Sequence, residues 1–121
     1  MLTLIIILKN NNFMSNIFSI LFKTIKKNKK KNPQTSYTSF LFKKGINFCL
    51  EKFKEEFLEL IDAFKKKNKK NIIHESADLI YHLLILLEKK KINIKKVFEE
   101  LKRRRRTSGI EEKLNRKKNV R

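Results

Sequence analysis

Four acidic side chains recur at helical spacing in the middle of a strongly basic chain. Glu56 and Glu59 are three residues apart, and Glu75 and Asp78 repeat this spacing. Residues three apart are neighbours on one face of a helix, so each pair presents two carboxylates together. Two antiparallel helices with a short connection would bring the pairs face to face. Such a cluster needs a compensating cation, and oxygen ligands suit Mg²⁺ or Mn²⁺.

A site of this kind indicates phosphate or pyrophosphate chemistry, because Mg²⁺ retains waters and binds phosphate oxygens. The alternative is an ordinary solvated helix face, since Glu and Lys alternate over residues 51–67. The second pair argues against that alternative. Glu75 and Asp78 lie in the apolar stretch "HESADLIYHLLILLEKK", where unpaired acids are costly. A capping role in the first helical turn could explain Glu75 but not Asp78.

The overall charge is less informative than these acids. The 121 residues include 31 basic and 12 acidic side chains, a formal charge of +19 that is typical of nucleic-acid-binding or membrane-surface proteins. Most of the basic residues are lysines in a chain rich in Asn, Ile and Phe, the residues that codons rich in A and T encode. Part of the charge is therefore a mutational signature, and we expect neither a specific nucleic acid nor a membrane as partner.

Helices are the elements predicted to position the acids. The apolar residues of the segment before residue 66 recur on one helical face, and no stretch alternates with the period of a strand, so the fold is predicted to be all-α. Asn71 and Asn93 are candidate N-caps of the last two helices, and Ser15 or Asn16 of the first. The expected helices cover residues 14–27, from Ser36 or Thr38 to 66, 71–90 and 94–106; the expected apolar face of the second is Phe53, Phe57, Leu60, Ile61 and Phe64.

The length of the chain indicates one domain, expected over residues 14–106. Residues 1–13 are interpreted as an N-terminal extension of uncertain origin, and their apolar run is too short to span a bilayer. Residues 107–121 form a basic C-terminal tail with a break at Gly109. The single Cys49 is expected to be a core thiol in a reducing compartment, which favours the cytoplasm.

Four segments of the chain together resemble the phosphoribosyl-ATP pyrophosphatase family, which belongs to the all-α, MazG-like nucleotide pyrophosphatases. The family's EExxE…ExxD signature is matched by Glu55, Glu56, Glu59, Glu75 and Asp78. The chain departs from the family pattern at Phe53, where a smaller aliphatic residue is common, at Lys54, where glycine is usual, and at Asp62, where an apolar residue is usual. The segments are "SYTSFLFKKG", "KFKEEFLEL", "ESADLIYHLLILL" and "VFEELKRR".

The resemblance implies a four-helix, MazG-like bundle that hydrolyses phosphoribosyl-ATP to phosphoribosyl-AMP and pyrophosphate. It implies Mg²⁺, with Mn²⁺ as a substitute, held by Glu56, Glu59, Glu75 and Asp78. It also implies a homodimer, which agrees with the apolar excess of residues 80–87. The other expected site residues are Glu55 as base or additional ligand, Lys52 on phosphate oxygens, and Ser36, Tyr37 and Thr38 on the phosphoribosyl end; for Ser36 and Thr38, helix capping is an equal alternative.

Overall fold

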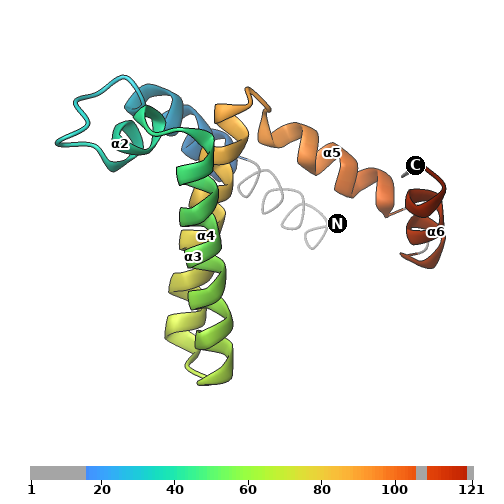
Figure 1. Cartoon of the computed structure of the whole chain (residues 1–121). Coiled ribbons are helices and arrows are strands. Elements are labelled where there is room, and N and C mark those ends of the chain that lie inside the picture. Colours follow the sequence, from blue (N-terminus) through green and yellow to red (C-terminus); the bar gives the residue numbers. More distant parts are fainter. Residues whose placement is uncertain (1–15, 106–108, 120–121) are drawn as a thin grey trace, which may run out of the picture.

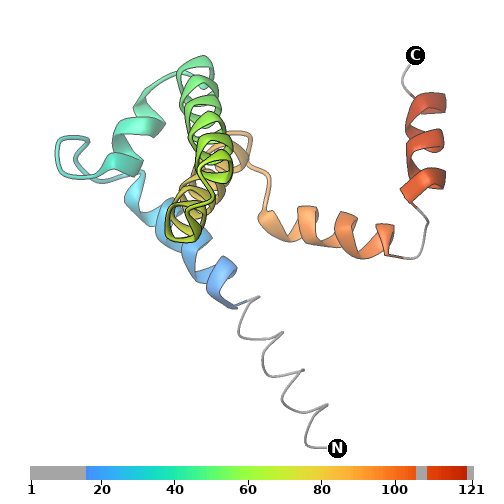
Figure 2. The same ribbon diagram turned by 90° about the horizontal axis from the view of Figure 1, so that it is seen from below.

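The computed structural model describes residues 16–105 and 109–119, and every regular element among them is a helix (Figure 1). The all-α prediction is confirmed for these residues. Helix α3 and helix α4 lie side by side as a long antiparallel hairpin, whereas α5 and α6 point away from it (Figures 1 and 2). The helices are residues 16–28, α2 (Tyr37–Lys43), α3 (Ile46–Lys65), α4 (Lys69–Lys89), α5 (Ile94–Arg104) and α6 (Gly109–Asn119). None of the described helices is long and apolar enough to cross a membrane.

The single helix predicted from Ser36 or Thr38 to residue 66 is wrong, because the structure divides it into α2 and α3. The backbone is extended at Lys44 and at Gly45, which precedes α3 without a side-chain cap. Lys89 of α4 stabilises the break: its ammonium donates to the carbonyl of Phe42 at 3.2 Å and to that of Lys44 at 2.6 Å. These contacts satisfy carbonyls that a continuous helix would have bonded internally. With α6 also helical, the described residues hold more than the four predicted helices.

The turn between α3 and α4 is shorter than the predicted connection. Asn68, and not Asn71, is the N-cap of α4, and its side chain accepts a hydrogen bond from the Asn71 backbone N–H at 3.2 Å. Lys67 has a φ of 56°, a left-handed conformation that lets α3 end within this tight turn. Asn93 is confirmed as the cap of α5, since it accepts from the Lys95 backbone N–H.

The ends of the chain test the remaining predictions only in part. The extension over residues 1–13, the start at residue 14 and the cap at Ser15 lie outside the described residues, and Asn16 is already helical. The predicted tail contains α6, which begins at Gly109. Residue 106, the predicted end of the fourth helix, also lies outside the described residues.

The core lies where residues 16–28, α2 and the second half of α4 meet. Leu41, Leu84 and Ile85 are fully buried, and each stabilises the fold by about 1.5–3 kcal/mol relative to exposure. Cys49 is buried as predicted, and its thiol donates to the Leu41 carbonyl at 3.2 Å. Buried Glu88 links α4 to the turn that follows the first helix, through an ion pair with Lys29 at 3.0 Å. The core cluster is Phe22, Ile25, Leu41, Cys49, Leu84, Ile85 and Ile94.

The far half of the hairpin has almost no core of its own. Between residues 50 and 81, all of which the structure describes, Ala63 is the only buried hydrophobic residue. Phe57 and Phe64, expected on a buried face, are 47% and 58% exposed. The prediction that this face is buried is therefore wrong for Phe57 and Phe64 within one chain. The two acidic pairs lie in this same part of the hairpin, where few residues are buried.

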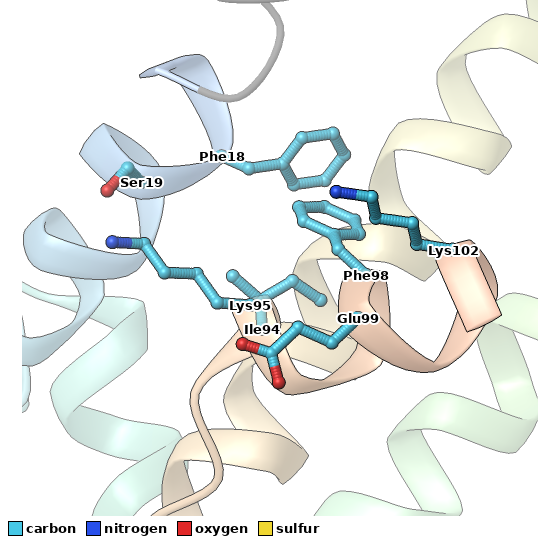
Figure 3. Close-up of a pocket in the computed structure, with 7 residues that line it drawn as sticks. All are labelled: Phe18, Ser19, Ile94, Lys95, Phe98, Glu99 and Lys102. Atoms are coloured by element: carbon cyan, nitrogen blue, oxygen red, sulfur yellow. The ribbon is translucent and has the colours of Figure 1, made fainter.

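One pocket lies away from the carboxylates, between the first helix and α5 (Figure 3). Phe18 and Phe98 meet edge to face there, with ring centroids 5.1 Å apart. Lys95 and Lys102 extend on either side of the two rings. Among the described residues that line this pocket, Glu99 is the one with a carboxylate. The pocket therefore does not suit the predicted cation chemistry.

Candidate active site

The α3–α4 hairpin brings the two acidic pairs together. Glu56 and Glu59 come from α3, and one carboxylate oxygen of each lies within 4.8 Å of one from Glu75 on α4. Glu75 also belongs to a second group within the same distance, formed with Asp78 and His74. The short turn at Asn68 makes this possible, because it aligns the two helices in antiparallel register. The four residues predicted as metal ligands thus form one continuous cluster.

The electrostatics of this cluster fit a bound cation. Glu56 Oε2 and Glu75 Oε2 are buried atoms that have no hydrogen-bond partner among the residues that the structure describes. Burial raises the pKa of Glu56 to about 7, with further contributions from the charges of Glu59, Asp78 and Glu75. Burial also raises the pKa of Glu75, reinforced by Glu59 and Asp78 and opposed by His74. Crowded carboxylates with unpartnered oxygens are a donor set that a hard divalent ion would satisfy.

Glu55 lies outside the carboxylate cluster. It is 57% exposed, and its Oε2 accepts a hydrogen bond from the Lys52 ammonium at 3.2 Å. This contact raises the pKa of Lys52, so the ammonium stays protonated. Glu55 and Lys52 therefore form a charged pair on α3, one residue before the first predicted ligand.

The three residues at the start of α2 have different surroundings. Ser36 is the N-cap, and its Oγ accepts from the Ser39 backbone N–H at 3.2 Å. Thr38 is buried, and its hydroxyl is 2.5 Å from that of Tyr81. Tyr37 is 49% exposed. Burial raises its pKa, with Lys52 lowering it and Glu56 raising it, so these charges lie close to the phenol. Of the three, Tyr37 is the one whose side chain is open to a ligand.

His82 fixes the orientation of the Tyr37 phenol from α4. Its Nδ1 lies 2.9 Å from the Asp78 carbonyl, and its Nε2 lies 3.4 Å from the Tyr37 hydroxyl. Because the Asp78 carbonyl can only accept, Nδ1 carries the proton and the Tyr37 O–H donates to Nε2 in the neutral ring. The polar atoms of His82 and the hydroxyl of Tyr81 thus have partners within the fold.

Comparison with known proteins identifies the family. The sequence profile described as "Phosphoribosyl-ATP pyrophosphohydrolase" matches residues 18–105, most of the chain. The chain belongs to the phosphoribosyl-ATP pyrophosphohydrolase family. This confirms the resemblance drawn from the EExxE…ExxD signature, and the matched range contains every candidate site residue.

Individual proteins similar to this chain support the same family assignment. The chain is 42% identical over 90 residues to the phosphoribosyl-ATP pyrophosphatase of Rhodobacter capsulatus, covering 74% of this chain and 87% of the relative. It is 43% identical over 95 residues to the enzyme of the same name from Paracoccus denitrificans, covering 78% and 88%. The histidine biosynthesis bifunctional protein HisIE of Helicobacter hepaticus is 44% identical over 101 residues, 84% of this chain and 44% of that protein.

The departures from the family pattern at Lys54 and Asp62 lie on α3 and are not among the clustered carboxylates. Lys54 is exposed on α3. Asp62 pairs with Lys66 at 3.0 Å and lines a pocket that it shares with Glu59 and Glu75. Neither residue displaces a predicted ligand. Asp62 instead adds a carboxylate to that pocket.

The basic end of α5 belongs to a solvated surface. The carboxylate of Glu100 accepts hydrogen bonds from Arg103 at 2.7 Å and from Arg104 at 3.2 Å. These two contacts hold the pKa of Glu100 down at about 2. The arginines therefore have partners on their own helix, as expected for a solvated helix end.

Sequence reasoning missed one member of the site, His74. Its Nε2 lies 3.3 Å from Asp78 Oδ2, and it belongs to the group with Glu75 and Asp78. The signal was present in the sequence, because His74 and Asp78 are four residues apart and therefore share a helix face.

Proposed function

We propose that this chain hydrolyses phosphoribosyl-ATP between its α and β phosphorus atoms and so releases phosphoribosyl-AMP and pyrophosphate, the second step of histidine biosynthesis. Membership of the family supports this reaction. The observation that carries the chemistry is the convergence of α3 and α4 carboxylates around two unpartnered oxygens. A triphosphate and a carboxylate cluster are both negatively charged and repel each other, so the substrate can bind there only when cations lie between them.

Glu56, Glu59, Glu75 and Asp78 are the residues that would hold Mg²⁺. Once bound there, Mg²⁺ or Mn²⁺ supplies positive charge for the triphosphate and makes a nearby water more acidic. Because these carboxylates come from both helices of the hairpin, their arrangement determines the position of the bound cation. Their positions on two helices, rather than on loops, keep the site rigid.

The remaining side chains act on the substrate and the water. Glu55 is assigned as the base that accepts the proton of the attacking water, and Lys52 as the cation that binds a phosphate oxygen. Tyr37 is assigned to the phosphoribosyl end, with its hydroxyl oriented by His82. Ser36 and Thr38 support this end by capping α2 and by packing against Tyr81.

A substrate comparison tests this function. With Mg²⁺ present, we expect kcat/KM for phosphoribosyl-ATP to exceed that for ATP or dCTP by at least about 10²-fold, because only the first carries the phosphoribosyl group. Release of pyrophosphate is the measurement, and EDTA-treated protein is the control. Equal values for the three compounds would instead support a MazG-like nucleoside triphosphate pyrophosphatase, the main alternative.

A homodimer accounts for the uncovered half of the hairpin. Phe57 and Phe64 on α3 are exposed, and so are Ile73 and Ile80 on α4, at 71% and 41%. Apolar surface of this extent around a rigid site is typical of an interface. Sedimentation of the purified chain is expected to give twice the mass of one chain, and a monomer at micromolar concentration would contradict the proposal.

The cytoplasm is the proposed location, since the buried and unpaired Cys49 suits a reducing compartment. A basic nucleic-acid-binding protein is the remaining alternative, and its affinity would fall steeply with salt and be insensitive to Asp78→Asn. The clustered carboxylates do not favour it.

A further inference from the structure

His74 gives the carboxylate cluster a nitrogen donor. In the α4 sequence "HESAD", His74 and Asp78 are four residues apart and Glu75 lies between them on the chain. One donor atom from each of the three residues lies within 4.8 Å of the others. His74 is 70% exposed, so its imidazole can reorient at little cost. Histidine four residues from another ligand on one helix face is the spacing by which helices bind zinc.

The distance between His74 Nε2 and Asp78 Oδ2 suits two ligands of one ion. It is 3.3 Å, longer than the roughly 2.7–2.9 Å of a charge-assisted hydrogen bond. Two ligands about 2.0–2.1 Å from a tetrahedral ion are about 3.3 Å apart. The observed pair therefore needs little rearrangement to receive a metal ion in place of a shared proton.

Nitrogen and oxygen donors together select a different ion from oxygen alone. Carboxylates suit Mg²⁺, whereas imidazole favours Zn²⁺ and related transition-metal ions. Glu75 completes the set, because its Oε2 has no hydrogen-bond partner. We propose that His74, Glu75 and Asp78 form a mixed nitrogen and oxygen site for a divalent transition-metal ion such as Zn²⁺.

This second site has a functional consequence, which rests on the proposed function. Glu75 and Asp78 are also two of the four proposed Mg²⁺ ligands, so one carboxylate cluster serves two kinds of ion. Zn²⁺ held by His74 withdraws both residues from Mg²⁺ and thereby inhibits hydrolysis. Excess Mg²⁺ weakens Zn²⁺ binding in return, since the two ions compete for the same oxygens.

Imidazole nitrogen NMR tests the site directly, because the chain has only two histidines. The uniformly ¹⁵N-labelled full chain, without substrate, is titrated with Zn²⁺ and separately with Mg²⁺. We expect Zn²⁺ to shift the His74 nitrogen signals by many times more than those of His82, whose nitrogens are engaged by Asp78 and Tyr37. Mg²⁺ is expected to move neither set to a comparable degree.

Two variants complete the test. His74→Gln is expected to weaken Zn²⁺ binding at least about tenfold and to change Mg²⁺ binding much less, since Mg²⁺ prefers the oxygen ligands that the variant keeps. Lys70→Gln, an exposed change one turn earlier on α4, is the matched control and should bind Zn²⁺ like the unaltered chain. Unmoved His74 signals, or equal Zn²⁺ affinity in His74→Gln, would overturn the proposal and leave His74 as an ion-pair partner of Asp78. Neither readout uses phosphoribosyl-ATP, so failure of the proposed reaction is detected separately.

Discussion

Asp78→Asn is expected to lower the rate of phosphoribosyl-ATP hydrolysis by at least about 10²- to 10³-fold, the effect of losing one group that organises charge in a transition state. The amide keeps the size of the carboxylate but removes the negative charge that a cation needs. Asp78 is partly exposed and its side chain contacts His74, so the change leaves the core untouched. Turnover at saturating Mg²⁺ is the measurement, with circular dichroism reporting helical content.

A control variant at an acid on α3 distinguishes the loss of a metal ligand from the loss of an ordinary surface charge. Asp62 on α3 is 59% exposed, pairs with Lys66, and is not part of either carboxylate group. Asp62→Asn is expected to keep turnover within a few-fold of the unaltered chain. Near-normal activity of Asp78→Asn at saturating Mg²⁺ would remove Asp78 from the ligand set. A simultaneous loss of helical content would instead show that the change acts through folding.

Local rules were sufficient for much of the fold. The all-α class follows from the spacing of apolar residues, and the cap at Asn93 follows from side-chain chemistry within one turn. The convergence of Glu56 and Glu59 on Glu75 follows from the helical repeat and a short connection. Each of these features is determined by residues close together in the sequence.

The features that could not be predicted from the sequence depend on tertiary contacts. The break between α2 and α3 depends on Lys89, which lies more than 40 residues away and satisfies the carbonyls of Phe42 and Lys44. The exposure of Phe57 and Phe64 cannot be anticipated from periodicity, because a helix face shows its apolar stripe whatever covers it. In the same way, the burial of Thr38 and its hydrogen bond to Tyr81 depend on a residue more than 40 positions away and could not be predicted from the sequence around α2.

Glu56→Gln is expected to have opposite effects on activity and on stability. Glu56 is half-buried beside like charges, so the metal-free fold carries a repulsion that the amide removes. Activity should fall as for Asp78→Asn, since a proposed ligand is lost. In EDTA at pH 8, however, the variant should unfold at a temperature several degrees higher than the unaltered chain, because about 1 kcal/mol corresponds to roughly 4 °C in a domain of this size.

The pH dependence of this stability follows from the direction of the shift. The pKa of Glu56 is raised in the folded chain to about 7 from an ordinary 4.5, so the folded protein binds this proton more tightly than the unfolded chain does. The stabilisation is complete below about pH 4.5 and is lost as the pH rises through about 7. Thermal unfolding in EDTA from pH 5 to pH 8 should therefore show a decline in the unaltered chain that is much weaker in Glu56→Gln.

Two further measurements make this expectation specific to the cluster. Glu51→Gln, an exposed acid on the same helix, should retain the decline of the unaltered chain. Saturating Mg²⁺ at pH 8 should raise the unfolding temperature of the unaltered chain more than that of Glu56→Gln, because an ion that binds only the folded state stabilises it through the ligands it finds there. Parallel pH profiles for the unaltered chain and Glu56→Gln would show that Glu56 is not the strained carboxylate. A cluster that destabilises the empty fold and is stabilised by a cation is suited to binding, because like charges brought together from two helices cost stability until an ion compensates them.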